Sequence, residues 1–187
     1  MEKVDIDWIP EVSAEIRNKA KKIKVILMDV DGVLTRGDIV YDSNGLEIKH
    51  FNAHDGQGIK LARVAGMKVG IISSRESGTI RVRAKELGFH YLYLGKDKKL
   101  PAFENLKSET GLHSENFCFI GDDLPDIPVM KEVGLGIAVG NATELTQQNA
   151  DYITRKGGGE GAVREVVEII LDAQNLLEDA IQNIWKT

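Results

Sequence analysis

Hydrophobic and polar positions alternate along the chain in blocks that are typical of an α/β protein. Short apolar runs rich in β-branched residues fit strands buried in a sheet. They occupy residues 24–29, 68–72, 91–94, 117–120, 135–139 and 152–153. Helical segments between them are expected around residues 55–66, 77–87 and 99–109, with a short one through 129–130. This order predicts a doubly wound, Rossmann-like parallel sheet with helices on both faces and right-handed crossovers.

A different pattern follows the first strand. Residues 38–42 and 46–51 alternate apolar and polar positions on either side of Ser43-Asn44-Gly45, and Asn-Gly between such runs is a strong hairpin signal. We therefore expect a small β-hairpin flap at about 37–51 above the active end of the sheet. An isolated two-stranded ribbon is marginal in water, so its apolar faces are expected to pack on a partner subunit.

Both ends of the chain are predicted to be helical. Residues 1–22 fit an accessory helix with Pro10 in its first turn, because Val12, Ile16 and Ala20 then share one face. At the other end, apolar residues recur at helical spacing from Val163 to Ile184. We divide the chain into this N-terminal helix, a main domain at 23–174 and a C-terminal helix extension at 175–187.

Composition narrows the possible functions. The 187 residues are 42% hydrophobic and 28% charged, and their net charge is −5, so there is no basic excess to meet nucleic acid or a membrane surface. The single cysteine, Cys118, lies in an apolar run and fits a buried thiol better than a nucleophile. No signal peptide or membrane-spanning run stands out, and the cytoplasm is the expected location.

Polar side chains follow four of the predicted strands where each strand ends. They are Asp29 and Asp31, Ser73 and Ser74, Lys99, and Asp122, Asp123 and Asp126. The carboxyl ends of the strands meet at one edge of a doubly wound sheet, so these groups should lie together. Carboxylates there favour Mg²⁺, hydroxyls and backbone amides favour a phosphoryl group, and a lysine neutralises its charge.

Each group taken alone has a simpler interpretation. Asp and Gly are turn formers, Ser73 fits a helix cap, and Asp126 fits the cap of the next helix. Lys96 and Lys98 compete with Lys99 for the lysine role and fit solvated positions. The strand context and the agreement of all four groups favour a site.

The four groups resemble the motifs of the haloacid dehalogenase superfamily, in its phosphatase branch. The matching stretches are Asp29-Val-Asp-Gly-Val-Leu34, Ser73, Lys99 and Gly121-Asp-Asp-Leu-Pro-Asp126. Further stretches narrow the resemblance to the 3-deoxy-D-manno-octulosonate 8-phosphate (KDO 8-phosphate) phosphatases, over about residues 23–174. These are residues 51–56, 121–130 and 152–166.

The resemblance implies a role for each residue of the site. Asp29 would form an aspartyl-phosphate, and Asp31 would act as general acid and then as general base. Mg²⁺ would be held by Asp29, Asp122 and the backbone carbonyl of Asp31. The phosphoryl group would be bound by Ser73, Lys99 and the amides of Gly32 and Ser74. Asp123 and Asp126 would support the metal and Lys99.

The family also implies a substrate, KDO 8-phosphate of lipopolysaccharide precursor synthesis, and a homotetramer in which the glycine-rich segment 157–161 reaches a neighbouring subunit's site. The chain departs from the family pattern at Arg36, where Asp is usual, and at His54, where Arg is usual. We therefore keep a nine-carbon ester such as 2-keto-3-deoxynononate 9-phosphate as an alternative. A catalytically silent sugar-acid-binding module and a phosphomutase are further alternatives. The predicted substrate contacts are Asn52, His54, Arg75, Gly158 and Gly159.

Overall fold

A six-stranded parallel sheet forms the centre of the molecule in this computed structural model, which describes residues 7–186. The strands are β1 (Val25–Met28), β4 (Lys68–Ile72), β5 (Tyr91–Tyr93), β6 (Phe117–Gly121), β7 (Leu135–Ala138) and β8 (Tyr152–Ile153). Their order is β5-β4-β1-β6-β7-β8. The predicted parallel sheet is confirmed. The chain leaves β1 toward β4 on one side and reaches β6 on the other, so the end of β1 is the switch point where such sheets bind ligands.

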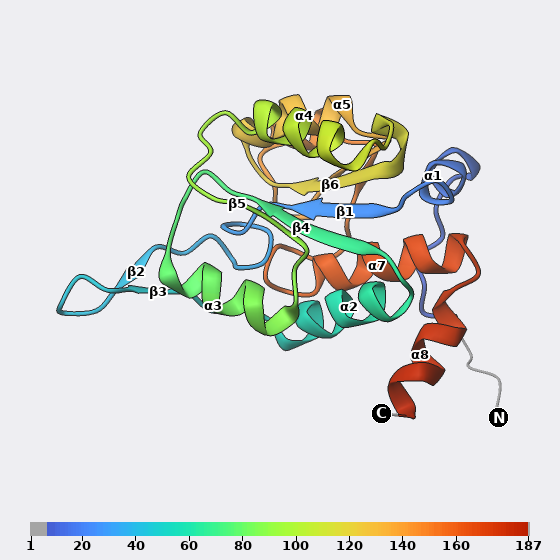
Figure 1. Ribbon diagram of the computed structural model, residues 1–187, viewed down its shortest axis with the longest axis horizontal. Coiled ribbons are helices and arrows are strands. Elements are labelled where there is room, and N and C mark those ends of the chain that lie inside the picture. The colour runs from blue at the N-terminus through green and yellow to red at the C-terminus, as the bar shows by residue number, and fades with distance from the viewer. Residues whose placement is uncertain (1–6, 187) are drawn as a thin grey trace.

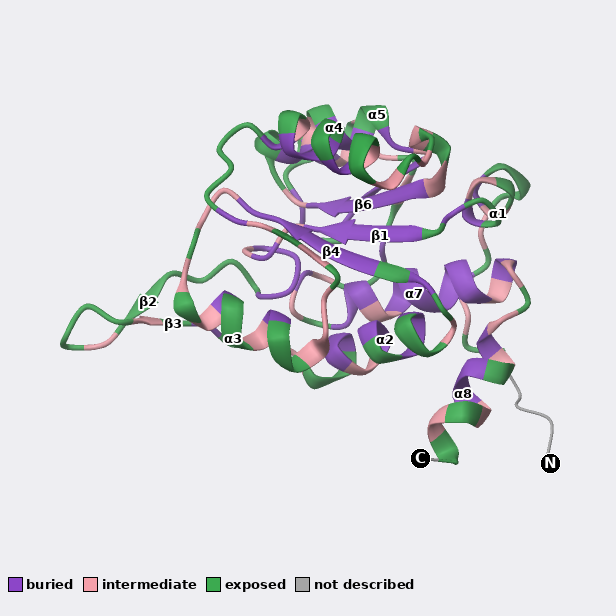
Figure 2. Cartoon of the chain, in the orientation of Figure 1, coloured by how far each residue is buried: buried purple, intermediate pink, exposed green. Residues whose placement is uncertain are grey.

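Helices cover both faces of this sheet (Figure 1). One face carries α4 (Lys99–Thr110) and α5 (Ile127–Glu132), and the other carries α2 (Ala53–Val64), α3 (Gly78–Leu87) and α7 (Ala162–Ala173). Every residue of β1 is buried, and the helices turn their buried sides to the sheet and their exposed sides outward (Figure 2). The core therefore holds β1 rigidly and fixes where its carboxyl end points. A short helix that the sequence pattern did not indicate, α6 (Glu144–Gln148), lies between β7 and β8.

The predicted hairpin is present, with β2 (Val40–Tyr41) antiparallel to β3 (Glu47–Ile48). Asp42 accepts hydrogen bonds from the amides of Asn44 and Leu46, both 2.8 Å, and closes the turn. The hairpin projects beyond the carboxyl end of β1 (Figure 1). Its strands are shorter than the sequence alternation predicts. Val40, Tyr41, Leu46 and Ile48 are exposed, since nothing in this single chain covers the ribbon.

The N-terminal helix begins later than predicted. Ser13 accepts a hydrogen bond from the Ile16 amide at 3.2 Å, and α1 runs over Ala14–Ala20, so the expected start at Pro10 is wrong. Residues 1–6 of the predicted segment lie outside the described residues. The helix packs against α7, where Arg17 pairs with Asp172 at 2.8 Å.

The expected single helix at the C-terminus is also wrong. It is divided into α7 and α8 (Leu177–Trp185) by Asn175, whose φ is +57°. The Gln174 side chain donates to the carbonyls of Ala20 and Ile23, at 2.9 and 2.8 Å, which anchors the break to the segment before β1. α8 buries Leu177, Ala180 and Ile181 and packs against α2 and α7. Across residues 7–186, no helix combines the length and apolar character needed to cross a bilayer.

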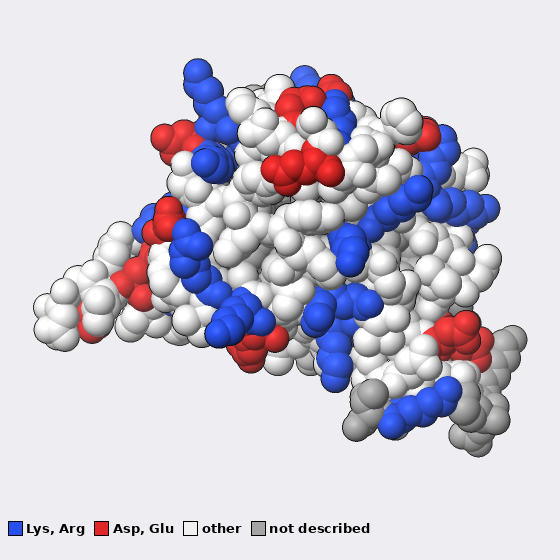
Figure 3. All heavy atoms as spheres, in the orientation of Figure 1, with Lys and Arg blue, Asp and Glu red and all other residues white. Residues whose placement is uncertain are grey.

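Charged side chains of both signs lie on the face drawn in Figure 3. The basic ones gather in several groups across the middle and right of this face, and acidic ones lie toward the top and the edges.

Candidate active site

The residues after β1 form a tight acidic loop, 29–35. The carbonyl of Val30 accepts from the amides of Val33, Leu34 and Thr35, at 3.2, 2.9 and 3.0 Å, which turns the chain back over the strand end. Gly32 has φ +91°, a conformation that side chains other than Gly rarely adopt. A Cβ on Gly32 would also lie 2.0 Å from Oδ2 of Asp122. Only glycine therefore lets the loop pass this close to the loop after β6.

Lys99 lies at the centre of the site although it begins a helix. Its side chain is 1% exposed, and its Nζ lies 2.9 Å from Oδ2 of Asp29 and 2.6 Å from Oδ1 of Asp126. The other oxygen of Asp126 accepts from the amides of Asp122 and Asp123, at 2.9 and 3.3 Å. The carboxylate of Asp126 is thus fully used in holding Lys99 and the loop after β6, as expected for a supporting residue.

Burial and like charge raise the pKa of two carboxyls here. Burial raises the pKa of Asp29 to about 6. The positive charge of Lys99 opposes this rise, and the negative charge of Asp126 adds to it. Burial, with Asp126 and Asp29 adding to it, raises the pKa of Asp122 to about 8. Burial opposes the charge of Lys99, but the carboxylates of Asp29 and Asp126 raise its pKa. The ammonium is therefore charged, and the acids need more positive charge than it supplies.

Two buried oxygens fit a cation. Oδ1 of Asp29 and Oδ1 of Asp122 have no hydrogen-bond partner among the described residues, and oxygens of Asp29, Asp122 and Asp126 lie within 4.8 Å of one another. Hard divalent cations prefer carboxylate oxygens, and Mg²⁺ is held by one or two carboxylates with water and substrate oxygens. Because Asp126 is already occupied, Asp29 and Asp122 are the side chains that fit Mg²⁺.

The predicted phosphate-binding serines lie on the neighbouring strand. β4 pairs with β1 in the register Met28 to Ile71, so continuing both strands places Ser73 beside the acidic loop. Ser73 is 1% exposed, its amide donates to the Tyr93 carbonyl and its Oγ accepts from the Arg75 amide at 3.3 Å. The Ser74 hydroxyl donates to the Lys96 carbonyl at 3.4 Å. The four predicted groups thus end at one edge of the sheet, as the spacing indicated.

Lys49 is a site residue that sequence reasoning missed. It follows β3 in the hairpin, its side chain is 1% exposed and its Nζ lies 2.5 Å from Oδ1 of Asp31. Glu47 lies 3.2 Å from the same ammonium and 2.5 Å from a guanidinium nitrogen of Arg75. Part of the signal was available, because Glu47 and Lys49 alternate with apolar Ile48 and must share one face of the ribbon, but the pattern did not show which segment that face would meet. Arg75 is held by this network rather than left free.

Asp55 is a second missed residue, with a structural role. It is 1% exposed and accepts from the amides of Gly161 and Arg164, at 3.2 and 3.0 Å. These amides open α7, more than one hundred residues later in the chain, so Asp55 caps that helix from α2. It thereby fixes the C-terminal end of the glycine-rich segment 157–161 against α2.

The glycine-rich segment packs against its own chain's acidic loop. The Gly159 amide donates to the Val33 carbonyl at 2.8 Å, and a Cβ on Gly158 would lie 1.6 Å from the Gly32 carbonyl oxygen. Asn52 donates to the Gly159 carbonyl at 2.9 Å and accepts from the His54 amide at 2.8 Å. Two of the predicted substrate contacts, Asn52 and Gly159, therefore lie side by side.

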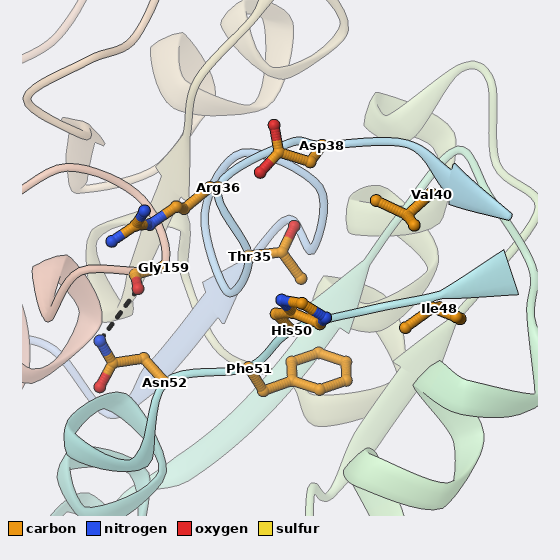
Figure 4. A pocket seen from close by; sticks show the side chains of 9 residues that line it. All are labelled: Thr35, Arg36, Asp38, Val40, Ile48, His50, Phe51, Asn52 and Gly159. Carbon is orange, nitrogen blue, oxygen red and sulfur yellow. Dashed lines mark hydrogen bonds between the residues drawn. The ribbon is translucent and has the colours of Figure 1, made fainter. Parts of the chain in front are cut away.

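A cavity of about 340 Å³ adjoins this contact. Figure 4 shows Asn52 reaching toward Gly159, with Thr35 and Arg36 from the end of the acidic loop on another wall. The remaining lining residues are Asp38, Val40, Ile48, His50 and Phe51. His54 does not join them. It lines a different cavity with Trp8, Arg155 and Lys156, so this chain's own fold does not bring it to the cavity beside the acidic loop.

Comparisons with known proteins agree with this geometry. Residues 92–166 match the haloacid dehalogenase-like hydrolase family. The 3-deoxy-D-manno-octulosonate 8-phosphate phosphatase of Escherichia coli is 44% identical over 169 residues, which are 90% of each chain. The Yersinia pestis phosphatase of the same name superposes with a TM-score of 0.90 at 40% identity, covering 95% of this chain and 96% of that one.

The phosphatase of Moraxella catarrhalis, solved in complex with magnesium, phosphate and KDO, is 45% identical over 91% of this chain and 98% of that one, with a TM-score of 0.88. Identity at this level over nearly the whole length, on the same fold, shows the family and confirms the resemblance that the motifs indicated. The chain belongs to the 3-deoxy-D-manno-octulosonate 8-phosphate phosphatases, a family of haloacid dehalogenase-like hydrolases.

Proposed function

We propose that this chain is a Mg²⁺-dependent phosphomonoesterase that hydrolyses KDO 8-phosphate to KDO and phosphate, in lipopolysaccharide precursor biosynthesis. The observation that carries this function is the pair of buried, unpartnered oxygens on Asp29 and Asp122 beside the Lys99 ammonium, among the residues described. The magnesium, phosphate and KDO held by the Moraxella catarrhalis relative support the same chemistry.

Mg²⁺ would be held by Asp29, Asp122 and the backbone carbonyl of Asp31. When bound, it supplies positive charge that lowers the raised pKa values of the two carboxyls and polarises a phosphoryl oxygen. Gly32 is what allows Asp122 to approach the acidic loop closely enough for this, because any Cβ would occupy the place of the Asp122 carboxylate.

Asp29 is the nucleophile. One of its oxygens forms a bond to phosphorus as the bond from phosphorus to the sugar oxygen breaks, which leaves an aspartyl-phosphate. Asp31 gives a proton to the departing sugar oxygen in this step. It then takes a proton from the water that attacks the aspartyl-phosphate, which releases phosphate and restores both carboxyls.

The phosphoryl oxygens carry the developing charge and need donors that are already in place. Lys99 provides the charged donor, held between Asp29 and Asp126. The Ser73 hydroxyl and the amides of Gly32 and Ser74 complete the predicted set. Asp123 would support the metal, and Asp126 orients Lys99.

The sugar acid is proposed to occupy the cavity beside the acidic loop, where Asn52 and Gly159 meet, and Gly158 is proposed to support this contact by packing on the Gly32 carbonyl. Arg75 is held at the edge of the site by Glu47 and Asp31, and the part of its guanidinium that Glu47 does not engage is proposed to meet a substrate carboxylate. His54 lies at a different cavity of this chain, so its contribution to substrate binding is proposed through a neighbouring subunit.

We propose a homotetramer in the cytoplasm. The support for assembly is the hairpin, whose apolar side chains Ile39, Val40, Tyr41, Leu46 and Ile48 are all at least 40% exposed. Exposed apolar side chains grouped on one projecting element are typical of an interface. Sedimentation velocity of the full chain tests the proposal, and a monomer across the micromolar range would contradict it.

A phosphate-release screen across sugar phosphates, with Mg²⁺ or a chelator, tests the activity itself. We expect release from KDO 8-phosphate with Mg²⁺ and loss of release on chelation. Asp29→Asn should abolish turnover and leave the thermal midpoint within a few degrees of the wild type. Faster turnover of 2-keto-3-deoxynononate 9-phosphate would replace the substrate, and no release from any sugar-acid ester would favour a silent binding module.

A further inference from the structure

The hairpin buries a lysine at the catalytic loop. Lys49 is 1% exposed in its side chain, although lysines are almost never fully buried unless they are paired. Its Nζ lies 2.5 Å from Oδ1 of Asp31 and 3.2 Å from Oε1 of Glu47. Burying this side chain costs both desolvation and rotamer freedom, so its partners define what it does.

Arg75 completes a ring of alternating charges. One guanidinium nitrogen lies 2.5 Å from Oε1 of Glu47, and Nε lies 3.8 Å from Oδ2 of Asp31. The four side chains come from three separate segments, the acidic loop, the hairpin and the loop after β4. Two cations and two carboxylates leave the ring with no net charge.

Anchoring of the hairpin is a weak explanation for this ring. Buried ion pairs contribute little net stability, and apolar side chains of similar volume would hold a ribbon at least as well. What an ion pair adds is a fixed orientation of the groups it joins. The group whose orientation affects the chemistry here is Asp31.

The two oxygens of Asp31 differ in their surroundings. Oδ1 accepts the short hydrogen bond from Lys49. Oδ2 is buried and has no hydrogen-bond partner among the residues described, because Nε of Arg75 at 3.8 Å is too distant to donate one. Lys49 thus anchors one oxygen and leaves the other available to a substrate.

We propose that Lys49 is a positioning residue that fixes the Asp31 carboxyl so that Oδ2 exchanges the proton with the reacting groups. The inference rests on the proposed function. The first step starts from the form in which Oδ2 of Asp31 carries a proton. As Asp29 forms its bond to phosphorus, the ester oxygen leaves and takes this proton, which leaves Asp31 as the carboxylate of the ring. In the second step Oδ2 takes the proton of the attacking water. Lys49 donates its hydrogen bond to Oδ1 throughout and transfers no proton.

The dependence of kcat/KM on the leaving group distinguishes this role from one in which Lys49 only holds the hairpin in place. An alkyl phosphate needs protonation of its leaving oxygen, whereas p-nitrophenyl phosphate releases a stable anion and needs little help. With Mg²⁺ present, Lys49→Met should lower kcat/KM by about 10²-fold for the alkyl ester, as expected for a displaced general acid. For p-nitrophenyl phosphate the loss should be within about threefold. The exposed Lys60→Met is the matched control and should change neither value.

A double-mutant cycle tests whether Lys49 acts through Asp31. In an Asp31→Asn background, Lys49→Met should change kcat/KM for the alkyl ester less than about threefold, because the carboxyl that Lys49 orients is absent. Lys49→Arg keeps a cation and should recover at least about tenfold of the loss. It also provides the test if the Met variant does not fold, with circular dichroism as the check.

Equal losses of kcat/KM on both esters, or a full effect of Lys49→Met in the Asp31→Asn background, would overturn the positioning role. These outcomes are distinct from failure of the proposed function. In that case the wild type itself would release no phosphate from either ester, or Asp29→Asn would retain turnover.

Discussion

The acids of the site make the stability of the metal-free protein depend on pH. The raised pKa values of Asp29, about 6, and Asp122, about 8, mean that the folded state binds protons more tightly than the unfolded chain does. Stability from these groups is complete below about pH 4, the unfolded value, and is lost as pH rises through the folded values. Mg²⁺ reverses this trend, because it binds the ionised carboxylates.

The magnitude follows from the shift. For Asp122, a rise from 3.8 to about 8 sets a ceiling of about 6 kcal/mol at about 1.4 kcal/mol per pKa unit. Asp126 raises the pKa of both Asp29 and Asp122, and Asp29 adds to the rise at Asp122, so protonating Asp29 lowers the shift that remains at Asp122. We therefore expect the free energy of unfolding to fall by about 3 kcal/mol between pH 5 and pH 8 in chelator.

Urea denaturation followed by circular dichroism, in steps of pH with EDTA or with Mg²⁺, measures this directly. Asp122→Asn removes the largest shift and should reduce the loss between pH 5 and pH 8 to less than about 1 kcal/mol. Asp97→Asn is the control, because this carboxylate is exposed and lies outside the acidic cluster. If the wild type and Asp122→Asn lose stability equally over this range in EDTA, the carboxyls do not have the raised pKa values that the structure indicates.

Three further predictions concern packing and charge. Gly158→Ala would place a Cβ 1.6 Å from the Gly32 carbonyl oxygen. It should reduce kcat at least about tenfold, because the acidic loop is displaced. Gly78→Ala is the control and should leave kcat unchanged, because the space around Gly78 is open. Lys99→Met leaves two buried carboxylates unpaired and should lower both kcat and the thermal midpoint; an unchanged midpoint would contradict the pairing. Burial raises the pKa of the Cys118 thiol, so thiol reagents should modify the folded protein no faster than it unfolds.

Much of the fold was determined by local pattern. Each parallel strand was predicted within a residue or so, because a short β-branched run bounded by glycine or polar residues has few other conformations available. The two wrong helix boundaries have different physical causes. Pro10 fits a helix start, but the Ser13 hydroxyl caps α1 three residues later through a local hydrogen bond. Helical periodicity continues past Asn175, but Gln174 hydrogen-bonds the segment before β1 and turns the chain. A local cap decided the first boundary, and tertiary hydrogen bonds decided the second.

Sequence order by itself determined which groups meet at the end of β1, because a doubly wound parallel sheet brings the ends of its strands to one edge. Their strand context alone was enough to group four residues into one site, namely Asp29, Ser73, Lys99 and Asp122. Only the tertiary structure decided what reaches this edge from outside the sheet. The burial of Lys49 against Asp31 depends on how the hairpin folds back, and the contact of Gly159 with Val33 joins residues 126 positions apart. No local pattern encodes such contacts, since they exist only when the whole core places both segments at once.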